Sequence, residues 1–274
     1  MASTHTIQLA ISPCPNDTFI FDALINQKID TQGVEFTPVF ADAETLNQAA
    51  LKRTYPLTKL SYHAFAFVKD KYNLLASGGA LGEDCGPILI SLLKYSRWDV
   101  RFLKIAIPGK LTTANFLLQY YQPKGKVCLP YVFSKIEDAI LFNSVDAGVI
   151  IHENRFTFKE KGLMEVQDLG TYWEENTGLP IPLGGIVIDK NLPRKTQQAI
   201  GQLVRESVAY ALANPNGTLP FVKQYAQEME DDVMLKHIKT FVNHYSIDLG
   251  PKGEKAAKKM LETLKISPDF EVIR

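Results

Sequence analysis

The sequence predicts an α/β protein of two lobes, and three observations carry this prediction. Short apolar strand patterns alternate with helical patterns through the first two thirds of the chain, as in mostly parallel sheets with helices on both faces. The last third shows only apolar stripes at helical spacing, which predicts a helical C-terminal tail. The 274 residues exceed one comfortable sheet domain, yet no Gly/Ser-rich linker divides the chain.

The patterns can be followed along the chain. Apolar runs predict strands near 6–12, 34–40, 56–61, 73–79, 87–93, 102–107, 125–129, 146–151, 163–169 and 184–189. Apolar residues three or four positions apart predict helices near 17–27, 42–51, 62–70, 112–121, 133–142, 153–161 and 171–176. In the tail, similar stripes start at Ile200, Phe221, Val233 and Ala257.

Two of these strands are suited to carry the chain between the lobes. The segments 87–93 and 184–189 are apolar, rich in β-forming residues and preceded by Gly or Pro. We therefore predict a discontinuous first lobe, 1–94 plus 185–274, with residues 95–184 inserted as the second lobe. Paired lobes of this kind hold a ligand in the cleft between them, at the carboxyl ends of strands.

Charge and hydropathy argue against several function classes. Thirty Lys and Arg balance thirty Asp and Glu, so no overall field attracts nucleic acid or an anionic membrane. No apolar run approaches membrane-spanning length, and the N-terminus has no basic start, apolar core or cleavage site of a secretory signal. We expect a cytoplasmic protein whose partner is a small molecule.

The cysteines and histidines do not predict a metal site. Three cysteines are few, odd in number and widely spaced, which argues against a disulfide framework or a CxxC site and favours a reducing compartment. A nucleophilic thiol at Cys14 or Cys85 is disfavoured because the sequence assigns neither one a histidine partner. No HExxH or other ligand spacing relates the remaining histidines His5, His237 and His244.

The first strand-to-helix loop, Ser12-Pro13-Cys14-Pro15-Asn16-Asp17-Thr18-Phe19, is dense in Pro, Cys, Asn and Asp. Asp17 is placed to cap the following helix, whose first amides then point at whatever enters. Asn16 is a candidate ligand contact. The alternative is an ordinary connection; we favour a ligand-facing loop.

His152 is the leading candidate for catalysis. It follows the strand pattern 146–151 and therefore lies at a strand's carboxyl end, where open α/β sheets present their functional groups. Histidine titrates near neutrality and can accept a proton at pH 7. Glu153 would orient the ring or cap the next helix. The alternative is a structural histidine with satisfied hydrogen bonds.

The segment Pro108-Gly109-Lys110-Leu111-Thr112-Thr113-Ala114-Asn115 opens another helix after a strand. The hydroxyls of Thr112 and Thr113 beside the first helical amides make an anion cradle, suited to a carboxylate as much as to a phosphate. The spacing of a Walker loop is absent. A plain threonine N-cap is the alternative.

Further candidates lie at two other strand ends. Lys59 can pair with an anionic ligand, and Ser61 can hydrogen-bond to that ligand or cap the next helix. The pair Gly184-Gly185 would bring the backbone close to a ligand or act as a hinge. Large aromatic residues that could stack on a ring, or equally lie in the core, are Phe19, Phe21, Tyr62, Phe116 and Trp173.

Several of these segments, in matching order between residues 7 and 190, resemble the 1,4-dihydroxy-6-naphthoate synthase family of the futalosine route to menaquinone. The segments are SPCPNDTF at 12–19, KLSY at 59–62, Gly-Pro at 86–87, Thr-Thr-Ala at 112–114, DAGVIIHE at 146–153 and PLGG at 182–185. SPCPNDTF together with the later IHE is specific, whereas the Thr-Thr-Ala or Gly-Gly pieces alone are not.

The resemblance implies a fold like the type II periplasmic solute-binding proteins. It also implies the cleavage of cyclic dehypoxanthine futalosine, a carboxylated substrate, into 1,4-dihydroxy-6-naphthoate and dihydroxyacetone without a cofactor. The family's proton acceptor falls on His152. Its substrate contacts fall on Lys59, Leu60 and Ser61 and on Thr112, Thr113 and Ala114. We expect the amides and hydroxyls of Thr112 and Thr113 to hold the carboxylate or a developing oxyanion.

Two other functions fit a two-lobed chain. A solute-binding protein uses the same cleft without catalysis, and the missing export signal counts against it. The effector domain of a transcription regulator would follow a helix-turn-helix segment or a basic patch, and neither is evident.

Overall fold

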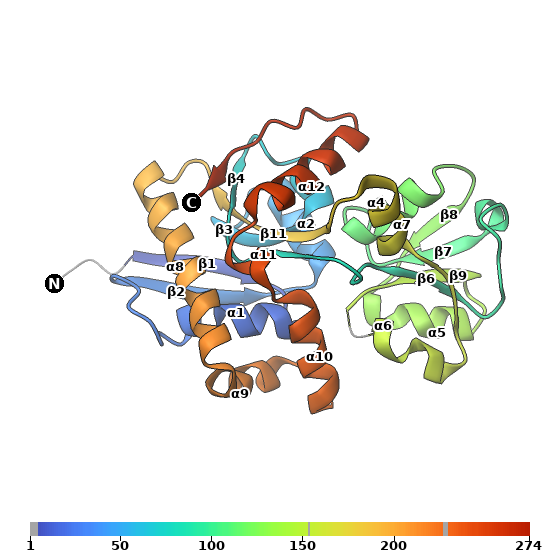
Figure 1. The fold of residues 1–274 in the computed structure, drawn as a ribbon, viewed down its shortest axis with the longest axis horizontal. Helices are drawn as coiled ribbons and strands as arrows, with labels where there is room; N and C mark the ends of the chain where they lie inside the picture. Colours follow the sequence, from blue (N-terminus) through green and yellow to red (C-terminus); the bar gives the residue numbers. More distant parts are fainter. Residues whose placement is uncertain (1–4, 153, 227–229) are drawn as a thin grey trace.

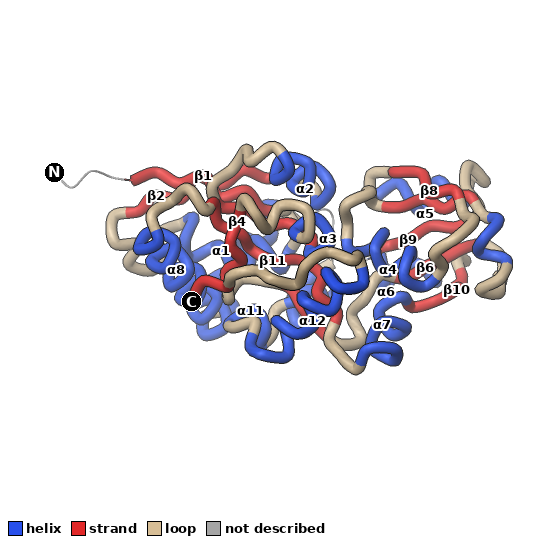
Figure 2. Tube along the Cα trace, turned by 90° about the horizontal axis from the view of Figure 1, so that it is seen from above, coloured by secondary structure: helices blue, strands red, loops and turns tan. Residues whose placement is uncertain are grey.

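Two mixed sheets, one in each lobe, form the framework of the molecule (Figure 1). The computed structural model describes residues 5–152, 154–226 and 230–274. The two lobes lie side by side, and the chain passes between them twice (Figures 1 and 2). The predicted two-lobed α/β class is confirmed.

The sheet of the first lobe has the strand order β12-β4-β11-β3-β1-β2, and β5 also pairs with β11. Its strands are β1 (His5–Ile11), β2 (Val34–Phe40), β3 (Leu57–Ser61), β4 (Tyr72–Leu75), β5 (Ala80–Gly82), β11 (Ile181–Asp189) and β12 (Val272–Ile273). The sheet of the second lobe has the order β10-β6-β9-β7-β8. Its strands are β6 (Ile88–Ser91), β7 (Lys104–Ile107), β8 (Val127–Pro130), β9 (Ala147–Ile150) and β10 (Met164–Asp168).

The sheets are less parallel than predicted. β1 pairs in parallel with β2 and β3, and β7 does so with β8 and β9. The strand β11, however, is antiparallel to β3, β4 and β5, and β6 is antiparallel to β9 and β10. For β11 the reason is the path of the chain. It enters the first sheet from the side of the second lobe, so it runs opposite to β3, β4 and β5, which precede the first crossing.

The lobe boundaries also differ in detail from the prediction. Ile88–Ser91 forms β6 of the second sheet, so the predicted boundary at residue 94 falls after the first strand of the second lobe. The predicted boundary at 184/185 falls inside β11, most of which pairs within the first sheet. Residues 83–87 therefore make the first crossing, and the residues just before β11 make the second.

Helices cover both sheets. Those of the first lobe before the crossing are α1 (Pro15–Ile25), α2 (Ala43–Leu51) and α3 (Tyr62–Phe65). The second lobe has α4 (Thr113–Tyr121), α5 (Ile136–Leu141), α6 (Asn154–Thr157) and α7 (Leu169–Thr177). The predicted helical tail is confirmed as α8 (Arg194–Ala213), α9 (Pro215–Tyr225), α10 (Asp231–Phe241), α11 (His244–Ile247) and α12 (Gly250–Thr263). The tail ends in β12, a strand too short to leave a sequence pattern.

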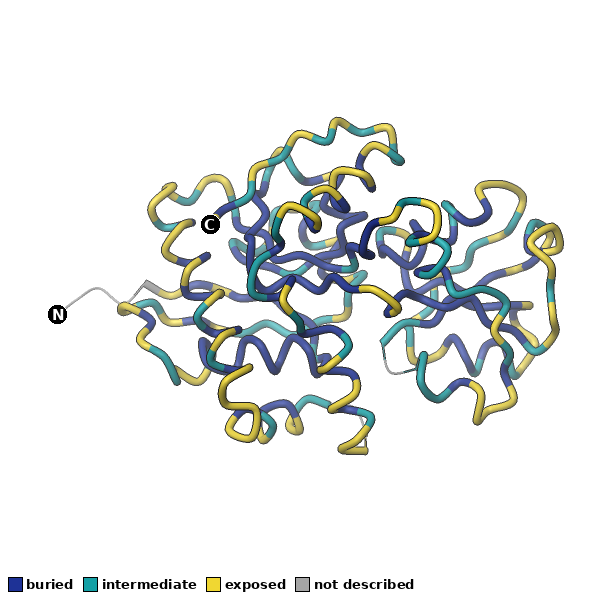
Figure 3. The backbone as a smooth tube through the Cα atoms, viewed as in Figure 1, coloured by how far each residue is buried: buried dark blue, intermediate teal, exposed yellow. Residues whose placement is uncertain are grey.

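Helix α1 is buried along almost its whole length (Figure 3). Pro15 at its first position fixes a helical φ where the missing N–H costs nothing. The tail helices α8, α9 and α10 pack against α1, so residues distant in sequence surround the loop that precedes it. This packing brings α10 to the cleft side of the first lobe.

The aromatic candidates are core residues. Phe19, Phe21, Tyr62, Phe116 and Trp173 are all buried, and none lines the cleft. Tyr62, Phe116 and Trp173 belong to one apolar cluster that also contains residues of both sheets. A continuous core thus joins the lobes behind the cleft.

The first crossing is packed too tightly for a side chain at Gly86. A Cβ there would lie 2.3 Å from the Cα of Gly170. We expect Gly86→Ala to lower the free energy of unfolding by about 1–3 kcal/mol, because backbone must move to admit the methyl group. Urea denaturation measures this. Gly217→Ala is the control, since nothing lies within 4 Å of its Cβ position; equal stability of the two variants would contradict the prediction.

Candidate active site

One cavity between the lobes contains all the predicted site residues. Its empty space, counted together with the open solvent at its mouth, is about 780 Å³. The predicted residues that line it are Asn16, Lys59, Leu60, Ser61, Thr112, Thr113, Ala114, His152 and Gly184. The first lobe and β11 supply one wall, and α4 with the loop after β9 supplies the other.

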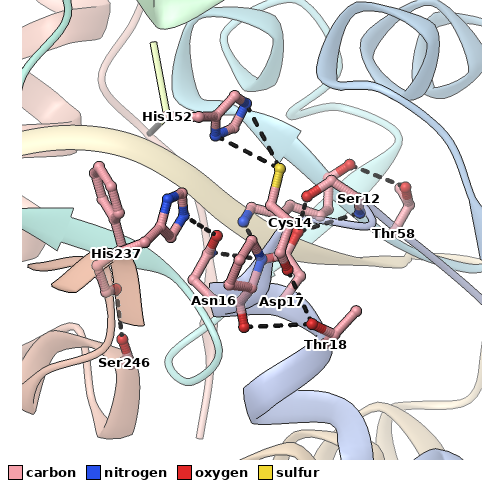
Figure 4. Close-up of polar contacts among 12 residues, drawn as sticks. Ser12, Cys14, Asn16, Asp17, Thr18, Thr58, His152, His237 and Ser246 are labelled. Atoms are coloured by element: carbon pink, nitrogen blue, oxygen red, sulfur yellow. Dashed lines mark hydrogen bonds and ion pairs between the residues drawn. The ribbon is translucent and has the colours of Figure 1, made fainter. Parts of the chain in front are cut away.

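His152 lies in the turn after β9, on the second lobe, and faces the first lobe (Figure 4). Its φ of 57° is in the left-handed region, which costs a non-glycine residue about 1–2 kcal/mol. Such strain is concentrated at functional sites. The ring is half-buried, edge-on to Phe133 at 5.0 Å between centroids. The predicted role of Glu153 lies outside the described residues.

Cys14 contacts the imidazole from the first lobe. Its Sγ lies 3.5 Å from His152 Nδ1 and 3.7 Å from Nε2 (Figure 4). The argument that no histidine is available to this thiol was therefore wrong, because the partner comes from the other lobe, 138 residues later. Cys85 has no such environment: burial raises the pKa of its thiol to about 12, which keeps it protonated and unreactive.

Asp17 does not cap α1 as predicted. The N-cap is Cys14, without a side-chain cap, and Asp17 is fully buried inside the first turn. Its Oδ2 accepts hydrogen bonds from the amide and the hydroxyl of Ser12, at 3.1 and 2.5 Å, and its Oδ1 accepts one from Asn16 Nδ2 at 2.8 Å. Oδ1 also forms an ion pair with Lys59 Nζ. The carboxylate thus ties together the ends of β1 and β3 and the start of α1.

Lys59 and Ser61 at the end of β3 are each held by a polar side chain of the first lobe, Lys59 by Asp17 and Ser61 by Asn47. The Lys59 side chain is 15% exposed, so its ammonium borders the cavity while it pairs with Asp17. Ser61 does not cap α3; its hydroxyl accepts a hydrogen bond from Asn47 Nδ2 at 3.1 Å. The position of the Lys59 ammonium at the cavity is therefore fixed by a buried anion; a second cation, Arg155, also lines the cavity and pairs with Asp168.

The Thr112–Ala114 segment forms the N-terminus of α4. Thr112 is the N-cap and accepts from the amide of Asn115, so the plain-cap alternative is correct for its side chain. Both hydroxyls, which were expected to bind a ligand together with the amides, donate within the protein: Thr112 Oγ1 to the carbonyl of Gly109 and Thr113 Oγ1 to that of Leu183, each at 2.8 Å. The first amides of the helix, which have no intrahelical acceptor, are the remaining donors.

Gly184 lies in β11 opposite Ser61, beside Lys59. A Cβ at Gly184 would lie 3.1 Å from Lys59 Cε, so a side chain here would crowd the ammonium. The glycine therefore keeps room for Lys59 at the cavity wall.

A family model described as "Menaquinone biosynthesis" matches residues 7–265. A protein of Thermus thermophilus named 1,4-dihydroxy-6-naphthoate synthase is 44% identical over 256 residues, which is 93% of each chain. One of the same name from Streptomyces coelicolor is 38% identical over 94% of this chain and 93% of its own.

The chain belongs to the 1,4-dihydroxy-6-naphthoate synthase family of menaquinone biosynthesis. Among solved structures, this member of the family is similar to a protein of Archaeoglobus fulgidus, with a TM-score of 0.90 and 33% identity over 96% of this chain and 98% of that one. The alkanesulfonate-binding protein SsuA of Xanthomonas axonopodis gives a TM-score of 0.73 at 12% identity, over 97% and 94% of the chains. This likeness shows the periplasmic-binding-protein-like fold.

His237 lies next to the cavity-lining residues Asn16 and His152 in this family member, a position that the sequence analysis did not predict. It lies in α10, is fully buried, and its Nε2 is 3.1 Å from Asn16 Oδ1 (Figure 4). Its ring is nearly parallel to that of His152, with centroids 5.9 Å apart. The one available sequence signal was a histidine on the apolar stripe of a tail helix.

The described residues of this family member contain no group of three or more His, Cys, Asp or Glu that could hold a metal ion. Among the helices of the described ranges, none is long and apolar enough to cross a membrane.

Acidification is expected to destabilise the protein through its buried histidines. Burial lowers the pKa of both His63 and His237. Below the unfolded-state pKa of about 6.5, the unfolded chain binds protons that the folded chain does not, so stability falls with pH by up to about 1.4 kcal/mol per histidine per pH unit. Urea denaturation between pH 7 and 5 measures this slope, and His63→Asn should reduce it. An unchanged slope in that variant would contradict the assignment.

Proposed function

We propose that the protein is a carbon–carbon lyase that converts cyclic dehypoxanthine futalosine into 1,4-dihydroxy-6-naphthoate and dihydroxyacetone, with His152 as the general base. The observation that carries the proposal is the position of His152: a strained residue at the carboxyl end of β9, on the rim of the interlobe cavity. The names of the relatives supply the product.

The chemistry needs a base and donors for developing negative charge. His152 accepts a proton from the substrate, and the carbon–carbon bond then breaks as its electron pair moves toward an oxygen atom. The cleavage is redox-neutral and ends in an aromatic ring, so the substrate itself supplies the driving force. A well-placed general base contributes about 10²–10⁴-fold to the rate.

The substrate carboxylate is assigned to the side of the cavity that holds Lys59 and the start of α4. Thr113 and Ala114 line the cavity, and their amides belong to the first turn of α4, at the positive end of the helix dipole. The Lys59 ammonium, paired with Asp17, is a further donor at the cavity wall. The amides thus keep the role expected of them from the sequence, while both threonine hydroxyls donate to backbone carbonyls.

Apolar side chains surround the rest of the cavity. Leu46, Leu60, Ile151, Leu183 and Phe241 line it, and they offer a dry surface for a fused ring. Exclusion of water protects a charged intermediate and strengthens each hydrogen bond to it. We assign the reaction to the cytoplasm, with a small molecule as the partner, in keeping with Cys14, Cys85 and Cys128, none of which forms a disulfide among the described residues.

Incubation with cyclic dehypoxanthine futalosine tests the function. We expect the absorbance of the naphthoate to appear together with an equal amount of dihydroxyacetone. A solute-binding protein of the same fold would bind the compound and release it unchanged. Binding without product over many equivalents of substrate would overturn the lyase assignment.

A further inference from the structure

The contact between His152 and His237 joins the two lobes. His152 follows β9 of the second lobe, whereas His237 belongs to α10, which packs on α1 and β5 of the first lobe. Lys236, the residue before His237, makes a second contact between the lobes: its Nζ lies 4.4 Å from the ring centroid of Phe156 in α6. Helix α10 of the first lobe therefore contacts the turn and short helix of the second lobe that contain His152 and Phe156.

The hydrogen bonds fix the protonation of His237. Asn16 Nδ2 donates to Asp17 Oδ1, so the carbonyl oxygen of the Asn16 amide faces His237. A carbonyl oxygen only accepts, so His237 Nε2 carries the proton and donates it. Nδ1 is then a bare acceptor, and it has no hydrogen-bond partner among the described residues. Burial, His152 and Lys59 all lower the pKa of this ring, which agrees with a neutral imidazole.

The ring face and the Nε2–H group of His237 contact different residues of the site. The ring face supports His152 from the first lobe at 5.9 Å, together with the Cys14 thiol. The Nε2–H holds Asn16, which lines the cavity. Asn16 in turn donates to Asp17, which pairs with Lys59. Two cavity-lining residues, Asn16 and Lys59, are therefore connected to the buried His237 ring by this network.

We propose that His237 is a positioning residue: its ring seats His152 when the lobes meet, and its Nε2–H orients Asn16 toward the substrate. The inference rests on the proposed function, in which His152 is the base. His237 does not line the cavity itself and acts through these two neighbours.

Two substitutions separate the two tasks. His237→Gln keeps a donor for Asn16 but removes the ring, so kcat should fall by about tenfold or more while KM stays within about twofold, because a misplaced base costs rate rather than binding. His237→Phe keeps a ring but leaves the Asn16 oxygen without its donor, so KM should rise by about tenfold with kcat within about threefold. A merely structural residue would not divide kcat from KM in this way.

A second measurement does not depend on turnover. His152 covers the Cys14 thiol, which is 8% exposed, so a displaced His152 should let iodoacetamide modify Cys14 about tenfold faster in His237→Gln. Peptide mass spectrometry separates this site from Cys85 and Cys128. His244→Gln, at an exposed position of the tail, is the control and should match the wild type.

The outcomes distinguish the two claims. Absence of naphthoate formation in the wild type would refute the proposed function, and the alkylation rates would still decide the positioning role. Unchanged kcat in His237→Gln, or an unchanged Cys14 alkylation rate in that variant, would overturn the positioning role. If His237→Gln does not fold, unchanged KM in His237→Phe overturns the orientation of Asn16 instead.

Discussion

Replacement of His152 by alanine is expected to lower the turnover of cyclic dehypoxanthine futalosine by about 10²–10⁴-fold. In the proposed mechanism the imidazole is the base, whereas the first amides of α4, Lys59 and the apolar residues that line the cavity bind the substrate without it. The dissociation constant should therefore change much less than the rate. Naphthoate absorbance under single-turnover conditions gives the rate, and calorimetry with the variant gives the affinity.

His244→Ala is the matched control for this experiment, because it removes an exposed histidine of the tail that is outside the cavity. Its turnover should equal that of the wild type. If His152→Ala kept turnover within tenfold of the wild type, the proton would have another acceptor. If instead it lost substrate affinity in proportion to the rate, His152 would be a binding residue.

The second large effect is expected at Asp17, on stability. Removal of one partner of a buried ion pair leaves the other charge uncompensated, which costs about 3–5 kcal/mol. Asp17 is fully buried, and it also accepts hydrogen bonds from Ser12 and Asn16. Asp17→Ala should therefore lower the free energy of unfolding, measured in urea, by this amount.

Two comparisons show whether the uncompensated charge is the cause. Lys59→Met in the Asp17→Ala background removes that charge and should recover part of the loss. Asp231→Ala breaks an exposed pair with Lys223 and should leave the unfolding midpoint unchanged. A loss in Asp17→Ala no larger than in Asp231→Ala would contradict the prediction.

Much of the cavity could be predicted from the sequence, because strand ends carry their own signal. His152 and the Thr112–Ala114 segment follow an apolar run and precede a helix, Lys59 lies in the last residues of such a run, and the carboxyl ends of strands in paired lobes face one cleft. The polar loop before α1 was found in the same way. For these residues, local pattern and general topology together were sufficient.

What the sequence did not predict depends on contacts between distant segments. Asp17 has the spacing of a cap, yet burial by the tail helices and the charge of Lys59 turn it inward. Cys14 acquires His152 from the other lobe, and His237 reaches the site because α10 packs on α1. The direction of β11 also follows from the path between lobes, which no local pattern records.

The central place of β11 has a consequence for biosynthesis on the ribosome. This strand lies between β3 and β4, so neither of them has its final neighbour until β11 has been translated, on the order of a hundred residues after β4. The inserted lobe, whose strands are contiguous in sequence, can complete its sheet first. The nascent chain must meanwhile shield two open strand edges, which are surfaces prone to self-association. The first lobe is therefore the first to be translated and the last to complete its sheet.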